Sequence, residues 1–149
     1  MRLLLVSSSG GHLTQLAALR TWWGDHEREW VTFDTPDARS ALDGERVAWG
    51  HFPTTRNVPN LLRNALLAWR ILRRHRPDVI VSTGAGIAVP FIYLGRLLGC
   101  RTAYLEVFDR IEIPTLTGRL CYPVVDLFAL QWPEQRRLYP RGVVVGHTL

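Results

Sequence analysis

Short apolar runs alternate with helical patterns along this whole chain, and this alternation constrains the fold more than any other feature. The runs that we expect to form strands cover residues 3–6, 29–33, 46–49, 78–81, 102–105, 127–130 and 142–145. Strands that are apolar throughout are typical of a parallel sheet buried on both faces. The sequence therefore predicts an α/β fold with a doubly wound, mostly parallel, Rossmann-like sheet.

The segments between these runs have apolar residues at helical spacing. We expect helices over residues 13–23, 36–42, 57–75, 88–98 and 115–122. A chain of 149 residues, 47% of them hydrophobic, is large enough to build one domain with a real core. We therefore expect residues 1–149 to form a single domain, with its ligands at the carboxyl ends of the strands.

Composition excludes several classes of function. The chain contains 18 arginines and no lysine, so a P-loop with its phosphate-binding lysine is excluded. Its two cysteines, Cys100 and Cys121, lack the spacing of a zinc site or a redox pair, and we expect no metal. The N-terminal apolar run is too short for a signal peptide, and no stretch is long enough to cross a membrane. We therefore expect a cytoplasmic protein.

Three unusual loops follow expected strands. Residues 7–12 read SSSGGH, residues 82–86 read STGAG, and residues 106–110 read EVFDR. Because the carboxyl ends of parallel strands meet at one edge of a sheet, we expect these loops to lie close together. They are the natural place for a binding or catalytic site.

The first loop favours phosphate. Small residues such as Ser9, Gly10 and Gly11 let main-chain N–H groups approach an anion at the start of a helix. A tight strand-to-helix turn is the structural alternative. The GxGxxG pattern of dinucleotide-binding proteins is absent, but Asp34 stands where a ribose-binding acid would lie. A nucleotide-binding oxidoreductase fragment therefore remains an alternative function.

His12 and Glu106 are the candidate catalytic residues. A histidine at a helix N-terminus is favoured as the neutral imidazole, which can accept a proton. Its structural alternative is a turn or capping residue. Glu106 follows an apolar run and could instead cap a helix or pair with Arg110, while Arg110 is itself a candidate for phosphate binding.

Four stretches, in matching order, resemble the acceptor-binding subunit of two-component glycosyltransferases. They read SSSGGHLTQL, DVIVSTGAG, YLEVFDR and LTGRLCYPVVDLFALQWPEQRRLYPRGVVVG. The chain is similar to the bacterial PssD-type subunit of capsule and exopolysaccharide synthesis. It is also similar to the membrane-anchoring subunit of the eukaryotic UDP-N-acetylglucosamine transferase of asparagine-linked glycosylation. In this family the chain is the N-terminal half of a GT-B glycosyltransferase, and a separate subunit binds the UDP-sugar.

The resemblance implies a heteromeric, metal-independent enzyme without a cofactor, which transfers a sugar to a lipid-linked diphosphate acceptor in polysaccharide biosynthesis. It implies that His12 is the general base and that Gly10 and Gly11 hold the diphosphate. Glu106 matches the acid of the family's E-S-F-x-R stretch, in which Val107 here replaces the serine. A second acceptor loop is implied for Thr83, Gly84, Ala85 and Gly86.

Residues 57–76 read NVPNLLRNALLAWRILRRHR and suggest membrane contact. Apolar residues recur at helical spacing, and the expected contact residues are Arg63, Trp69, Arg70, Arg73 and Arg74. Arginine-rich amphipathic helices lie on anionic membranes, but a core-packing helix with a basic last turn has the same pattern. The family's lipid acceptors favour a peripheral position at the inner face of the plasma membrane. A non-catalytic scaffold that recruits the donor-binding subunit is a second hypothesis; nucleic acid is not an expected partner.

Overall fold

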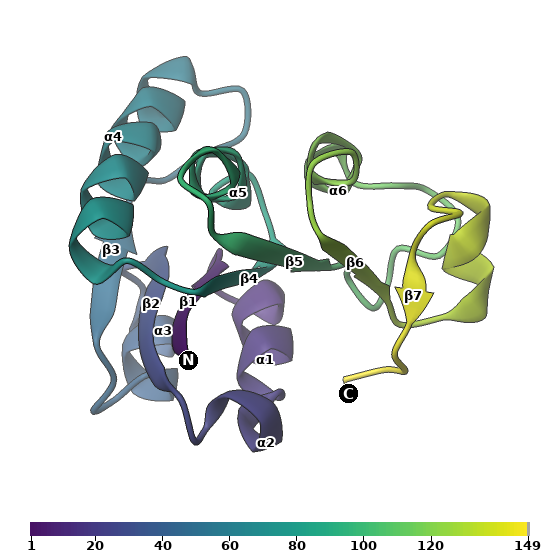
Figure 1. Cartoon of the computed structure of the whole chain (residues 1–149), viewed down its shortest axis with the longest axis horizontal. Helices are drawn as coiled ribbons and strands as arrows, with labels where there is room; N and C mark the ends of the chain where they lie inside the picture. The colour runs from purple at the N-terminus through teal and green to yellow at the C-terminus, as the bar shows by residue number, and fades with distance from the viewer. Residues whose placement is uncertain (149) are drawn as a thin grey trace.

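The computed structural model describes residues 1–148, which contain a seven-stranded parallel sheet (Figure 1). The sheet order is β3-β2-β1-β4-β5-β6-β7, and each neighbouring pair is parallel. The direction of winding changes between β1 and β4, which confirms the predicted doubly wound, Rossmann-like fold. The strands are β1 (Arg2–Ser7), β2 (Glu27–Phe33), β3 (Val47–Gly50), β4 (Val79–Gly84), β5 (Arg101–Leu105), β6 (Leu127–Leu130) and β7 (Val143–Val144).

Helices cover both faces of the sheet and enclose two apolar cores. One core packs α4, α5 and α6 against the sheet, and the other packs the helices near the N-terminus against β1 and β2. A short 3₁₀ helix, which the sequence did not predict, follows β6. The helices are α1 (Gly11–Ala17), α2 (Arg20–Trp23), α3 (Pro36–Ala41), α4 (Val58–His75), α5 (Ala88–Leu97), α6 (Leu116–Cys121) and η1 (Pro133–Arg137).

The single helix expected over residues 13–23 is wrong, because the chain breaks it into α1 and α2. Leu19 leaves the helical conformation at φ −81° and ψ 22°. The carbonyl of Leu16 accepts both the N–H of Leu19 at 3.2 Å and the indole N–H of Trp23 at 3.1 Å. The break turns Trp23 into the core, where 6% of it is exposed. Burial of this large aromatic side chain outweighs continuation of the helix.

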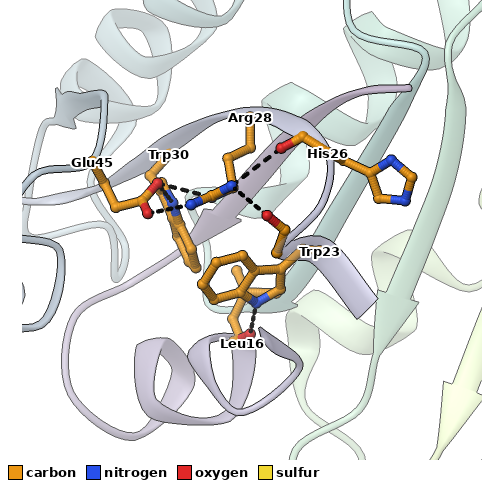
Figure 2. A network of polar contacts seen from close by, with 7 residues as sticks. Leu16, Trp23, His26, Arg28, Trp30 and Glu45 are labelled. Carbon is orange, nitrogen blue, oxygen red and sulfur yellow. Dashed lines mark hydrogen bonds and ion pairs between the residues drawn. The ribbon is translucent and has the colours of Figure 1, made fainter. Parts of the chain in front are cut away.

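A polar network holds α2 against β2 (Figure 2). The rings of Trp23 and Trp30 meet edge to face, with centroids 5.2 Å apart. Arg28 lies over the Trp23 ring and donates two hydrogen bonds to Glu45, which also accepts the indole N–H of Trp30. Partial burial acts to raise the pKa of Glu45, but the bonds from Arg28 and Trp30 lower it overall. This network fixes α2 against β2.

The strand ends bring the first two special loops together. Pairing between β1 and β4 shifts by one residue after Val6, so that Ser7 lies opposite Gly84. The N–H of Ser8 then donates to the carbonyl of Gly84 at 2.9 Å. The expected closeness of residues 7–12 and 82–86 is therefore present at the carboxyl edge of the sheet.

Candidate functional site

His12 lies in the first turn of α1 and is tied to the end of β4 by two hydrogen bonds. Its Nδ1 is 2.7 Å from the carbonyl oxygen of Thr83, and the Thr83 hydroxyl donates to the carbonyl of His12 at 2.6 Å. Since a carbonyl can only accept, Nδ1 carries the proton. In the neutral ring Nε2 therefore has the free lone pair, and the tautomer is fixed.

Gly84 leaves space for the His12 ring. Its φ of +105° belongs to a region that side chains disfavour, and a Cβ would lie 3.0 Å from both Nδ1 and Cε1 of His12. The same Cβ would lie 3.1 Å from the hydroxyl of Tyr104. Glycine is therefore required here by both conformation and space.

The main-chain amide of Gly10 already has an anionic partner. It donates to Oδ2 of Asp37, in the first turn of α3, at 3.0 Å. Hydrogen bonds from the Thr35 hydroxyl and from this amide lower the pKa of Asp37. The Gly10 amide, which the sequence analysis assigned to phosphate, therefore binds a carboxylate of the chain itself. Gly11, the next residue, is exposed at the start of α1.

A cavity of about 240 Å³, called here the carboxyl-edge cavity, brings several predicted site residues together. Of the predicted site residues, Gly11, His12 and Arg110 line it. Outside its lining lie Ser9, Gly10, Thr83, Gly84, Ala85, Gly86 and Glu106. A Cβ at Gly86 would instead lie 3.0 Å from the hydroxyl of Thr54. The lining consists of Gly11, His12, Gln15, Val107, Phe108, Asp109, Arg110 and Thr115.

Glu106 lies behind this cavity and is 0% exposed. Its carboxylate accepts the Tyr139 hydroxyl at 2.7 Å, the Val107 N–H at 2.9 Å and the Thr115 hydroxyl at 3.3 Å. Burial raises the pKa of Glu106, although these hydrogen bonds act in the opposite direction. In this structure the Glu106 carboxylate is bonded to Thr115, directly before α6. The catalytic role of Glu106 remains a prediction.

Sequence reasoning missed the polar side chains that support the cavity. Gln15 stands three residues after His12, so helical spacing alone places it on the same side of α1 and could have identified it. Gln131 and Gln135 belong to the QWPEQ stretch but were given no role. No local pattern predicts that they reach residues 106–110.

Several large apolar residues of α4 face solvent, although Ala68, Ile71 and Leu72 are buried in the core. The side-chain amides of Asn60 and Asn64 are buried because they bond the main chain of residues 51–53. This arrangement rotates the apolar residues of the first turns toward solvent. Their exposed fractions are 43% for Leu61, 65% for Leu62, 51% for Leu66 and 39% for Trp69.

The arginines predicted for membrane contact have different surroundings. Arg70 is exposed, Arg73 lies 5.3 Å from the centroid of the Trp69 ring, and Arg63 donates to Asn60. Arg74 forms an ion pair with the buried Glu29, although 66% of its own side chain is exposed. Within residues 1–148, every helix is too short or too polar to span a membrane.

Asp34 and the possible metal ligands can also be placed in the structure. The carboxylate of Asp34, the possible ribose ligand, is held by Arg39 through bonds of 2.5 and 2.8 Å. The bonds from Arg39 lower the pKa of Asp34. In the described part of the chain, no three His, Cys, Asp or Glu side chains gather as ligands for a metal ion.

Comparisons with known proteins agree with this architecture. A family model described as "Oligosaccharide biosynthesis protein Alg14 like" matches residues 51–148. The human UDP-N-acetylglucosamine transferase subunit ALG14 is 24% identical over 180 residues, which cover 100% of this chain and 83% of the human protein. A pyrophosphoryl-undecaprenol N-acetylglucosamine transferase of Alkaliphilus metalliredigens is 27% identical over 88 residues, covering 59% of this chain and 23% of that one.

Solved structures show the same fold in longer proteins. The crystal structure of MurG from Acinetobacter baumannii superposes with a TM-score of 0.77 at 15% identity, covering 99% of this chain and 46% of that chain. The chain therefore spans a little under half the length of this solved structure. Identity at this level establishes the fold alone.

Proposed function

Since this chain belongs to the family of Alg14-like oligosaccharide biosynthesis proteins, we propose that it is the acceptor-binding subunit of a two-subunit glycosyltransferase. The enzyme would transfer a sugar from a UDP-sugar to a lipid-linked diphosphate acceptor. The observation that supports this most is His12, held by Thr83 beside an open cavity at the carboxyl edge. The transferase names of the human and Alkaliphilus relatives support the class of reaction and acceptor.

In the proposed mechanism His12 is the general base. Because Nδ1–H donates to Thr83, Nε2 takes the proton from the acceptor hydroxyl. The oxygen of that hydroxyl attacks the anomeric carbon as the bond from this carbon to the UDP oxygen breaks, and UDP leaves with the electron pair. Proton transfer by a positioned side chain typically contributes about 10²–10⁴-fold to the rate.

The diphosphate of the acceptor is assigned to Arg110 and to the amide of Gly11. Arg110 supplies planar donors that suit phosphate oxygens, and both residues line the carboxyl-edge cavity with His12. The amide of Gly10 becomes available only if phosphate displaces Asp37. Ser9, Thr83 and Gly84 shape the loop around this position, whereas Ala85 and Gly86 lie further along the same edge.

A peripheral membrane position brings the lipid acceptor to this cavity. Leu62, Leu66 and Trp69 form an exposed apolar stripe on α4, with Arg70 and Arg73 beside it. Such a surface suits the boundary between lipid headgroups and acyl chains, where the apolar residues insert and the arginines meet anionic phosphate. We place this face at the cytoplasmic side of the plasma membrane.

The donor-binding subunit is proposed to cover an apolar groove on the face of the sheet that α5 and α6 leave open. In Figure 1, α5 and α6 lie on one side of β5 and β6, while α1 and α2 lie beside β1 and β4. A groove of about 580 Å³ is found on the less covered side, and exposed apolar surface of this kind marks protein interfaces. Its apolar lining includes Leu19, Trp22, Val81, Ala103, Leu105, Leu127, Ala129 and Val145.

The test is transfer of labelled sugar. The chain is co-expressed with a donor-binding subunit from the same organism, and the membranes are supplied with labelled UDP-N-acetylglucosamine. We expect label in a lipid fraction that releases it on mild acid treatment, as expected of a glycosyl diphosphate lipid. Absence of lipid-linked label from a complex that assembles and binds the nucleotide-sugar would reject the proposed acceptor class.

A non-catalytic scaffold is the second candidate, and the exposed stripe on α4 favours it. His12→Ala separates the two hypotheses. If this chain provides the base, the variant still binds its partner but loses transfer by about 10²-fold or more. If the chain is a scaffold, the variant keeps the activity of the unmodified complex.

A further inference from the structure

Loop 106–110 forms one wall of the carboxyl-edge cavity, and other segments hold its main chain. Gln135, on η1, donates from Nε2 to the carbonyls of Val107 and Arg110 at 3.1 and 3.0 Å. The indole of Trp132 donates to the carbonyl of Phe108 at 2.8 Å. A loop held at three of its carbonyls has little freedom to rearrange, although Asp109 and Arg110 are exposed at its tip.

Gln15 holds the same loop from the side of α1. Its Oε1 accepts the main-chain N–H of Phe108 at 3.1 Å and the Nε2–H of Gln131 at 2.5 Å. Because His12 begins the same helical turn, the helix that bears the proposed base is joined to the wall that bears Arg110. The distance between these two sides of the cavity therefore depends on the carboxamide of Gln15.

Gln131 is the centre of this arrangement and is 1% exposed. Besides its bond to Gln15, its Nε2 donates to the carbonyl of Glu106 at 3.0 Å. Its Oε1 accepts the N–H and the hydroxyl of Thr148 at 2.9 and 3.1 Å. One side chain thus joins α1, the start of the loop and the segment that follows β7.

A carboxamide fits this position better than any other group. Both amide hydrogens and both lone pairs of Gln131 are used, and no bond is left over. A carboxylate at position 131 would lack both donors and would place a buried charge against the oxygens of Gln15 and Glu106. An apolar side chain would leave these oxygens and Thr148 without their partner, which is costly in a buried place.

We propose that Gln131 is a positioning residue, which acts through Gln15 to fix loop 106–110 against α1 and so sets the shape of the carboxyl-edge cavity. Gln131 itself does not touch the acceptor. The inference rests on the proposed function only in taking a lipid diphosphate as the ligand of the cavity, for which farnesyl diphosphate is the probe.

The test compares three variants of the full chain by two measurements. Amide hydrogen exchange at Phe108 reports the bond to Gln15, and titration with farnesyl diphosphate reports the cavity. Gln131→Leu and Gln15→Leu remove partners, whereas Gln15→Glu keeps an oxygen that accepts both N–H groups. We expect both leucine variants to exchange Phe108 about tenfold faster and to bind the probe about tenfold more weakly, with Gln15→Glu near wild type in exchange.

A matched control separates positioning from general loss of stability. His75 is also buried and donates to the carbonyl of Leu3 at 3.0 Å, but it lies at the opposite edge of the sheet. We expect His75→Leu to lower the unfolding free energy without changing exchange at Phe108 or probe affinity. If Gln131→Leu does not fold, the comparison of Gln15→Leu with Gln15→Glu decides whether the loop is held through Gln15.

The outcomes separate this inference from the proposed function. Equal Phe108 exchange in wild type, Gln15→Leu and Gln15→Glu would overturn the positioning role. Faster exchange with unchanged probe affinity would also overturn it, because the cavity would not depend on the loop. A wild-type chain that does not bind farnesyl diphosphate would contradict the acceptor assignment, while Phe108 exchange would still decide the role of Gln131.

Discussion

At His12, one hydrogen bond decides which ring nitrogen can act as a base. The carbonyl of Thr83 requires a proton on Nδ1, so the lone pair is on Nε2. The Gly-Gly-His pattern predicted a histidine at a helix start, but it could not predict the tautomer. That detail depends on the end of β4, 71 residues away in the sequence.

Gly84→Ala is expected to disturb His12. Alanine at this position has a disfavoured φ, and its Cβ would lie 3.0 Å from the imidazole, so we expect the ring to shift by a few tenths of an ångström. Gly99→Ala is the matched control, because Gly99 has a φ of +85° and no atom lies within 4 Å of its Cβ. The imidazole resonances of His12 in NMR spectra are expected to shift in Gly84→Ala and to stay unchanged in Gly99→Ala. Equal shifts of these His12 resonances in the two variants would mean that Gly84 matters only for its backbone conformation, and not for the space that it leaves beside the imidazole.

Glu106→Gln is expected to change how stability depends on pH. Burial raises the pKa of Glu106, so the folded protein holds this proton more tightly than the unfolded chain does. The resulting stability is complete below about pH 4.3, the ordinary glutamate value, and is lost as pH rises through the folded-state pKa. The glutamine variant does not titrate, so it should lack this decline.

Urea unfolding between acid and neutral pH measures this difference. Asp37 and Glu45 have lowered pKa values and give the opposite slope, but they do so in both proteins and cancel in the comparison. The unfolding free energy of wild type should therefore fall relative to that of Glu106→Gln as the pH rises. Parallel curves would show that burial does not shift the titration of Glu106.

Among the elements, strands were predicted better than helix faces. Apolar runs identified all seven strands within residues 1–148, because central parallel strands are buried on both sides. On α4 the periodic apolar residues fitted both a membrane-facing and a core-packing helix, and the pattern did not show that Asn60 and Asn64 share its buried side. Their partners lie in residues 51–53, and a periodicity pattern does not include such contacts.

The outward face of α4 gives a prediction about membranes. Replacing Arg70 and Arg73 by glutamine should weaken binding to vesicles that contain anionic lipid by about fivefold for each arginine, and less at high salt. Replacing Leu62 and Leu66 by glutamine should weaken binding at every salt concentration, because the loss is apolar. Flotation with vesicles measures both effects.

The control for this experiment uses arginines at a distance from α4. Arg136 and Arg137 are exposed on η1, which lies across the molecule from α4 in Figure 1. Their replacement by glutamine removes the same charge and should leave flotation unchanged. An equal loss in the control and in the α4 variants would mean that net charge, and not this helix, attracts the membrane.

Over the whole molecule, the site was predictable where topology determines it. Parallel strands place residues 7–12, 82–86 and 106–110 at one edge, and the structure has them there. The support of that site was not predictable, because the bond between Gln15 and Gln131 joins residues 116 positions apart. Helical spacing places Gln15 on the side of α1 that bears His12, but nothing in the sequence around Gln131 distinguishes it from a surface glutamine.

We propose that this chain provides half of an active site and that the donor-binding subunit provides the other half. Its carboxyl-edge cavity is lined by His12, Gly11 and Arg110, the residues proposed to serve the acceptor. The most direct measurement adds increasing amounts of the donor-binding subunit to a fixed amount of this chain and records sugar transfer from UDP-N-acetylglucosamine to lipid. We predict no transfer at zero and a rate that levels off at one subunit per chain. Turnover by the purified chain alone, at a rate that no added subunit improves, would contradict the account.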